Sequence, residues 1–241
     1  MDIIFTNTFG VPEEYAPKPA TAYVPDWYKN LESYTSGEKK PSGDGETSAT
    51  IKRCMPVFDA ITGGYILTTY TDVFISQRPL LDPNTNEDTG KTTLWYEWPS
   101  YGPINWHPIE QAPNHPMRNG HKVSYPKWIN PWSIKTPPGY SVLFVQPMHR
   151  ESVFTILPGI VDTDTYTAPV NFPFVLNDVK MEGLIPAGTP MAQVIPFKRD
   201  SWEMTMGKLE DLETQNKVTN KLRTRFFDSY KSQFRQPKEY K

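Results

Sequence analysis

Two acidic residues, Asp162 and Asp164, lie two positions apart in the stretch LPGIVDTDTY, directly after an apolar run. Where such a pair ends a β-strand, both carboxylates point to one face, about 7 Å apart along the strand. One carboxylate could then orient a water molecule or bind a sugar hydroxyl. The same side chains could instead close a hairpin by accepting backbone N–H bonds. The sequence leaves both interpretations open, and the second is the simpler one.

Three of the four histidines, His107, His115 and His121, fall within one short Pro-rich segment. Metal-binding pairs usually stand four positions apart on a helix or two apart on a strand, and these histidines are spaced more widely. We expect no metal site and no cofactor, and these three residues are the candidates if a metal binds. The sequence also lacks a phosphate-binding glycine loop and a Gly-x-Ser-x-Gly nucleophile motif.

Composition limits the class of protein. The 241-residue chain is 37% hydrophobic and 22% charged, which permits a packed core and argues against general disorder. Its 25 prolines, 13 tyrosines and 7 tryptophans favour strands and ordered loops over helices. A formal net charge of −2 without a basic block gives no support for a nucleic-acid partner. The single cysteine, Cys54, excludes an internal disulfide framework and fits a reducing compartment.

The sequence gives no sign of a membrane or secretory segment. No apolar stretch approaches the about 20 residues that a membrane helix needs. The N-terminus MDIIFTNTFG lacks the basic and apolar regions of a signal peptide. We therefore expect a soluble protein that is either intracellular or assembled into a particle, with no membrane partner.

Three segments follow one another along the chain. Residues 1–50 form an extended Pro-rich arm with one short helix that starts near Pro25, and then a flexible polar loop from Ser36 to Ser48. Residues 51–199 carry short apolar runs between turn signals, a rhythm typical of an antiparallel β barrel or sandwich. The first part of this body, GGYILTTYTDVFIS, predicts a pair of strands. A long Pro-rich insertion follows near 82–130.

Residues 200–241 have a different chemistry. Apart from Pro237 they lack proline and are rich in Lys, Glu, Gln and Arg, with apolar residues at helical spacings. They predict one long amphipathic helix or two shorter ones, which would pack on the β body or on a partner subunit.

Several motifs of the body occur in a fixed order. TPPGYSVLFVQPMHR, PGIVDTDTY, PVNFPFVL and GLIPAGTPMAQVIPFKR follow one another, and GGYILTTYTDVFI lies upstream. In this order they resemble the trimeric dUTPase and dCTP deaminase family, over about Thr62–Arg199. The resemblance implies a mainly β, dUTPase-like β-clip body, with an N-terminal arm and a C-terminal α-helix added, and a trimer whose pockets form between subunits.

The same resemblance implies a set of candidate site residues. Asp162 or Asp164 takes the place of a water-positioning carboxylate, and the candidates for binding a ligand are Tyr65, Gln146, His149, Arg150, Tyr166 and Gln193. The chain also departs from the family's pattern. Ile66 replaces an acidic residue of the first motif, QPMHRES replaces the phosphate-binding Arg-Ser-Ser, and one extra residue precedes Tyr166. The Gly-rich C-terminal arm is replaced by the helical segment, and these departures argue against dUTPase activity.

Longer stretches point to a second family. PDWYKNL, IKRCMPVFDAITGGYI, WINPWSIKTPPGY and FDSYKSQFR resemble an uncharacterised protein family of marine tailed phages, notably cyanophages. We therefore expect a phage-encoded, non-enzymatic structural or accessory protein, in the cytoplasm of the infected host or in the virion. It would form a homo-oligomer, with a trimer expected, and have other phage proteins as further partners. Two alternatives are a nucleotide or small-ligand binding module, and a divergent dUTPase-like hydrolase that uses Asp162.

Overall fold

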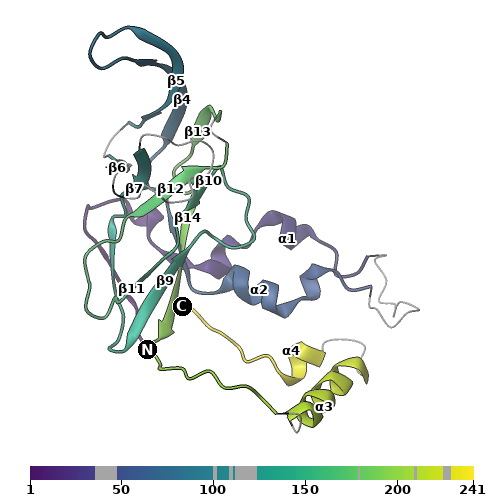
Figure 1. The fold of residues 1–241 in the computed structure, drawn as a ribbon. Coiled ribbons are helices and arrows are strands. Elements are labelled where there is room, and N and C mark those ends of the chain that lie inside the picture. The colour runs from purple at the N-terminus through teal and green to yellow at the C-terminus, as the bar shows by residue number, and fades with distance from the viewer. Residues whose placement is uncertain are drawn as a thin grey trace. The chain divides into compact units, whose positions relative to one another are not determined.

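The computed structural model describes residues 1–35, 48–99, 102–108, 111, 124–178, 180–208, 211–224 and 229–241. These residues confirm a mainly β protein, with several antiparallel sheets and a few short helices, including one near the C-terminus (Figure 1). The chain divides into two compact units. The sheet unit comprises Met1–Pro19 and Gly64–Arg199, and the helical unit comprises Ala20–Gly63 and Asp200–Lys241.

A five-stranded antiparallel sheet is the largest sheet of the sheet unit. Its strands, in spatial order, are β11 (Gly159–Val161), β9 (Tyr140–Val145), β14 (Pro190–Lys198), β3 (Tyr65–Thr68) and β2 (Lys18–Pro19). β14 lies between β9 and β3, so that Val194 stands opposite Phe144 on one side and Tyr65 on the other. All four residues of β3 are buried, as expected for an apolar inner strand. The sheet thus joins segments that are far apart in the sequence.

A four-stranded sheet carries a cluster of buried aromatic side chains. Its strands, in spatial order, are β10 (Phe154–Ile156), β12 (Phe172–Leu176), β7 (Ser124–Trp128) and β6 (Ile104–Pro108). The buried ring of Trp128 stacks on Phe174, with ring centroids 4.7 Å apart. Phe144 of β9 contacts Phe172 of β12 at a centroid distance of 5.2 Å. Aromatic packing therefore joins this sheet to the five-stranded sheet.

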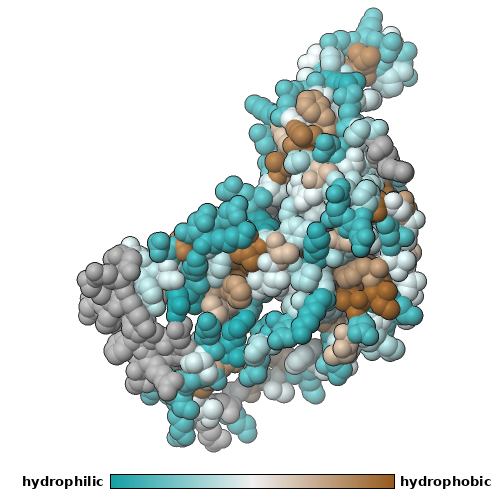
Figure 2. Space-filling view, turned by 180° about the vertical axis from the view of Figure 1, so that it is seen from behind, coloured by the Kyte–Doolittle hydropathy of each residue, from teal (hydrophilic) through white to brown (hydrophobic). Residues whose placement is uncertain are grey.

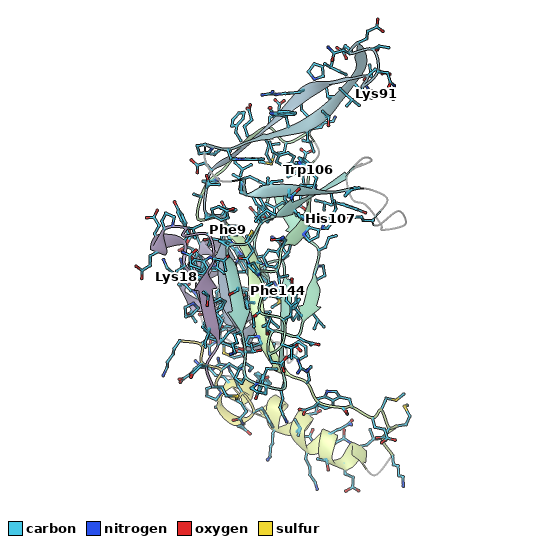
Figure 3. The ribbon with its side chains drawn as sticks, turned by 90° about the vertical axis from the view of Figure 1, so that its left-hand side faces the viewer. Phe9, Lys18, Lys91, Trp106, His107 and Phe144 are labelled. Atoms are coloured by element: carbon cyan, nitrogen blue, oxygen red, sulfur yellow. The ribbon has the colours of Figure 1, made fainter. Side chains whose placement is uncertain are left out.

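Two smaller sheets complete the sheet unit. One contains β13 (Gly183–Ile185), β4 (Val73–Leu81) and β5 (Asp88–Glu97), and the other contains β1 (Ile4–Asn7) and β8 (Trp132–Lys135). β4 and β5 form a long ribbon, and Lys91 lies near its far end (Figure 3). Val73 and Ile75 are buried on one face of β4, whereas Phe74 between them is exposed on the other. This sheet consequently has one buried and one solvent-exposed face.

The helical unit is held by contacts between its two chain segments. Its helices are η2 (Ala20–Tyr23), α1 (Asp26–Asn30), η3 (Ile51–Arg53), α2 (Met55–Thr62), α3 (Asp211–Thr224) and α4 (Ser229–Gln233), while η1 (Glu13–Tyr15) belongs to the sheet unit. Asp59 of α2 binds Arg235 at 2.7 Å and Lys238 at 2.9 Å. In the described part of the chain, no helix combines the length and apolar character needed to cross a membrane.

The strand expectations hold with one difference in pairing. The short helix after Pro25 and the two C-terminal helices are confirmed, as are strands in each of the apolar runs after Tyr140. GGYILTTYTDVFIS does contain two strands, β3 and β4, but they lie in different sheets. The reason is that the chain between them bonds elsewhere, because Thr69 N donates to Thr189 O and Thr69 O accepts from Gly188 N. Distant partners therefore separate the two strands.

Helix α2 was not expected within the β body. Its residues include Val57, Phe58 and Ile61, which are common in strands, but Pro56 in the first turn is a helix-start signal. The polar loop expected from Ser36 to Ser48 lies outside the described residues except for its last residue.

Candidate functional site

The two acids of the opening motif follow β11 in a tight turn. Both Thr165 N and Tyr166 N donate hydrogen bonds to Asp162 O, at 3.1 and 2.8 Å. Thr163, between the two acids, is buried, and its hydroxyl bonds that of Thr136 at 2.8 Å. With Thr163 directed inward, the turn presents both acidic side chains on the other side.

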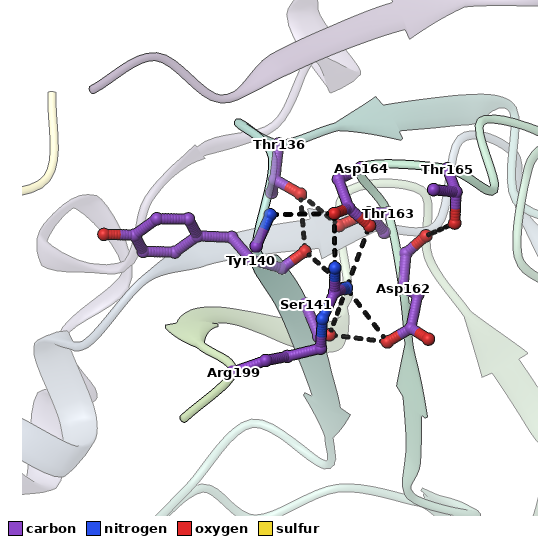
Figure 4. A network of polar contacts seen from close by, with 9 residues as sticks. Thr136, Tyr140, Ser141, Asp162, Thr163, Asp164, Thr165 and Arg199 are labelled. Atoms are coloured by element: carbon purple, nitrogen blue, oxygen red, sulfur yellow. Dashed lines mark hydrogen bonds and ion pairs between the residues drawn. The ribbon is translucent and has the colours of Figure 1, made fainter. Parts of the chain in front are cut away.

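Arg199, directly after β14, binds both carboxylates (Figure 4). Its two terminal nitrogens each bond one oxygen of Asp164, with 2.8 Å between Nη1 and Oδ1. Nη1 also lies 3.2 Å from Asp162 Oδ1. A two-pronged pair between arginine and a carboxylate is among the stronger charge-assisted contacts in proteins. The single cation therefore holds the two acids together.

The PPGY turn before β9 supplies the remaining partners. Gly139 N donates to Asp164 Oδ2 at 2.9 Å, and Ser141 Oγ donates to Asp162 Oδ1 at 2.6 Å. Arg199 N donates to Gly139 O at 2.8 Å, which ties the end of β14 to the same turn. We call Gly139, Ser141, Asp162, Asp164 and Arg199 the Arg199 clamp. It fastens three chain segments: the PPGY turn, the turn after β11 and the end of β14.

The two acids of the clamp differ in their surroundings. Hydrogen bonds from Arg199 and then from Gly139 N lower the pKa of the Asp164 carboxyl from 3.8 to about 2. The same pairing raises the pKa of the Arg199 guanidinium. The side chain of Asp164 is only 7% exposed, whereas that of Asp162 is 60% exposed. Asp164 is thus an enclosed carboxylate that is ionised at neutral pH, and Asp162 is the more exposed of the two acids.

This arrangement is better suited to fastening than to catalysis. A general base works best when its pKa lies near the working pH, and the Asp164 carboxylate is too weak a base. Asp162 Oδ1 already accepts a hydrogen bond from Ser141 Oγ and lies 3.2 Å from Arg199 Nη1. The hairpin interpretation, in which the acids accept N–H bonds where chain segments meet, therefore describes Asp164 well.

The two candidate glutamines also bind backbone. Gln193 Oε1 accepts a hydrogen bond from Met148 N, and Gln146 Oε1 accepts one from Ile156 N, both at 2.9 Å. They thereby hold the loop between β9 and β10, which also contains His149 and Arg150. His149 adopts a φ of 55°, in the left-handed region where residues other than glycine are uncommon. The side-chain oxygens of both glutamines serve to shape this loop.

The structure divides the candidates between the two ends of β9. Asp162 and Asp164 lie at the Ser141 end, and the exposed Tyr166 follows them in the same turn. Gln146, at the other end, is five residues from Ser141, or about 16 Å along a strand. The candidates at the Gln146 end are His149, Arg150 and Gln193, with Tyr65 on the next strand beyond Gln193.

Tyr65 is itself buried against the arm. Its ring packs edge-on against Phe5, with 5.2 Å between the centroids, and its backbone pairs with Pro19. A base could stack on Tyr65 only after this packing was removed. One chain by itself therefore does not bring Tyr65 together with the acids.

Of the three histidine candidates for a metal, the structure describes one. The side chain of His107 contacts Gln111 through a hydrogen bond between His107 Nδ1 and Gln111 Oε1. His115 and His121 lie outside the described residues. Within the described ranges, no three His, Cys, Asp or Glu side chains are grouped so that they could hold a metal ion.

Sequence reasoning missed the cation that organises the site. Arg199 lies 35 residues beyond Asp164, and Ser141 lies 21 residues before Asp162. The available signal was that a basic residue closes the last motif of the family resemblance, at the end of PFKR. Comparison with known proteins adds no further assignment, since no protein-family model and no curated protein matches the chain.

Proposed function

We propose that this protein is a non-enzymatic structural or accessory protein of tailed-phage type that acts as a homo-oligomer. Its body would be a dUTPase-like β-clip, and its place of action the cytoplasm of the infected host or the virion. The observation that carries the non-enzymatic part is the Arg199 clamp. Asp162 and Asp164 are the only pair of acids in the family-like motifs, and both form ion pairs with Arg199. Asp164 also accepts a hydrogen bond from the backbone N–H of Gly139.

The β-clip assignment is supported by the location of the motifs. Of the segments that resemble the dUTPase family, β3, β9, β11 and β14 are neighbours in one five-stranded sheet, while β4, β12 and β13 lie in the two sheets beside it in the same unit. Gly64, in the first motif, lies directly against Val194 in the last motif. Segments that together form one β-clip body must lie beside one another, and the shared sheet meets this requirement.

The oligomer is supported by apolar side chains left on the surface. Phe74, Trp95 and Leu184 are each about half exposed on one face of the sheet β13-β4-β5, and we call them the aromatic stripe. Apolar patches also appear in several places on the face shown in Figure 2. Contiguous exposed apolar surface marks interaction sites in proteins. The side chains from Leu212 to Lys221 on α3 are exposed as well.

A ligand and turnover screen tests the non-enzymatic proposal. Purified protein is screened by thermal shift with nucleoside triphosphates and Mg²⁺, and phosphate and pyrophosphate release are measured in parallel. We expect no shift above about 1 °C and no release. Asp162→Asn should also change stability little, because an exposed ion pair contributes about 0–1 kcal/mol.

Two results would contradict the proposal. Nucleotide-dependent stabilisation that is lost in Asp162→Asn but kept in the exposed control Glu151→Gln would show a binding module. Phosphate or pyrophosphate release lost in the same variant would show a divergent hydrolase that uses Asp162.

A further inference from the structure

The segment Ser201–Met206, here called the apolar segment, carries large apolar side chains at alternate positions. Trp202, Met204 and Met206 are 90%, 83% and 85% exposed. It contains no helix or strand, and Figure 1 shows it as part of an extended stretch between β14 and α3. Alternating apolar and polar residues are the pattern of a β-strand with one buried face. The apolar segment thus has the sequence of a strand, and among the described residues no strand pairs with it.

The outer edge of strand β5 is a place where such a segment could pair. β5 is the outer strand of the sheet β13-β4-β5, and on its outer side no strand of the described residues pairs with it. Protein edge strands are usually short, charged or covered, because an open edge pairs readily with another chain. β5 is ten residues long, and nine of its ten residues are at least partly exposed.

The aromatic stripe continues to the same edge. Leu184 stands opposite Phe74, and Trp95 stands opposite Ser76, two positions along β4 on the same face. The stripe therefore runs from β13 across β4 to β5, with the Arg78 guanidinium over the Trp95 ring at 4.6 Å. A strand added beside β5, with its apolar residues on this face, would extend the stripe by a further row.

We propose that the apolar segment of one copy adds as a strand to the outer edge of β5 in a second copy of this chain. Backbone pairing along an open edge supplies affinity, and alternate side chains supply specificity. The inference rests on the proposed function, since it names the contact that makes the homo-oligomer. Donor and acceptor are different surfaces, so the contact is head-to-tail and can close into a ring.

The exposed area is sufficient to support such a contact. Trp202, almost fully exposed, offers on the order of 200 Å² of apolar surface. With the two methionines and the half-exposed Trp95 of β5 beside them, these four side chains offer on the order of 500 Å² of exposed surface to the contact. Stable interfaces bury about 1,200–2,000 Å² in total, so these four side chains can supply about a third. Paired backbone and flanking residues would supply the rest.

Two variants and their mixture test the proposal by light scattering coupled to size exclusion. W202S/M204S/M206S removes the apolar side chains of the donor, and F74S/W95S removes the apolar side chains next to the acceptor edge, in both cases at exposed positions. We expect each variant alone to have the mass of one chain, with a circular-dichroism spectrum like that of the wild type. The matched control E203A/T205A, which changes the opposite face of the apolar segment, should keep the wild-type mass.

The mixture separates a lost contact from a lost fold. Mixed in equal amounts, the two variants retain one intact donor and one intact acceptor, so a complex of two chains should form. Wild-type mass in either variant alone would overturn the inference. So would a single-chain mass in the mixture of two folded variants. Neither result would contradict the homo-oligomer itself. A single-chain mass for the wild type would instead contradict the homo-oligomer of the proposed function.

Discussion

The contact between β3 and β14 can be broken by adding one methyl group at Gly64. Gly64 has a φ of +71°, and a Cβ built on it would lie 1.9 Å from Val194 O, whereas real Cβ atoms stay at least 3.0 Å from their neighbours. The obstructing atoms are backbone, so no side-chain rotation can relieve the overlap. The two strands must separate by roughly an ångström, within the sheet that contains the PPGY, DTD and first-motif strands.

Gly188→Ala provides the matched control. Gly188 has a φ of +83° and nothing within 4 Å of its Cβ position, so alanine there introduces backbone strain alone. That strain costs about 1–2 kcal/mol. Gly64→Ala bears the same strain plus the overlap, and we expect a total above about 4 kcal/mol, in the range of exceptional single substitutions.

Thermal unfolding followed by circular dichroism measures the difference. For a domain of this size, 1 kcal/mol shifts Tm by about 2–4 °C. Gly188→Ala should therefore lower Tm by about 2–8 °C, and Gly64→Ala by more than about 8 °C, or prevent folding altogether. Equal losses in the two variants would refute the close approach of Gly64 to Val194 and the strand pairing derived from it.

Three further predictions concern charge and packing. The pKa of the Asp164 carboxyl, held at about 2, lies below its unfolded value, so wild-type Tm should fall as the pH drops from about 4 toward 2. Asp164→Asn lacks this titration, and its Tm should fall less over that window. Arg235→Ala leaves the Asp59 carboxylate without its closest cation, so hydrogen exchange in α2 should quicken, and more than in Lys238→Ala, whose side chain is 48% exposed. Trp128→Ala should cost about 3–5 kcal/mol in urea unfolding, since the ring is 1% exposed.

Local pattern was sufficient to predict the strands and the turn chemistry. The apolar runs that form Tyr140–Val145 and Pro190–Lys198, each bounded by turn signals, depend only on neighbouring residues. The spacing of Asp162 and Asp164 likewise predicted that both carboxylates would lie on one side, and both contact Arg199. These features are encoded within a few residues of one another.

Pairing between distant segments could not be predicted in the same way. Nothing local to Asp164 indicates that Arg199 will neutralise it, because that contact depends on β14 lying beside β9. The separation of β3 from β4 has the same origin, since bonds from Thr69 to the chain just before β14 replace a hairpin turn. In α2, burial of Ile61 and Thr62 outweighs the strand preference of the apolar residues.

The mass of the wild-type chain in solution tests the central claim most directly. Light scattering over a range of micromolar concentrations should give a multiple of the 27.7 kDa chain mass, with three chains expected from the family resemblance. Loss of this assembly in W202S/M204S/M206S would place the apolar segment at the contact. A mass of 27.7 kDa at every concentration would contradict an assembly function and leave the exposed apolar segment and aromatic stripe without the role proposed for them.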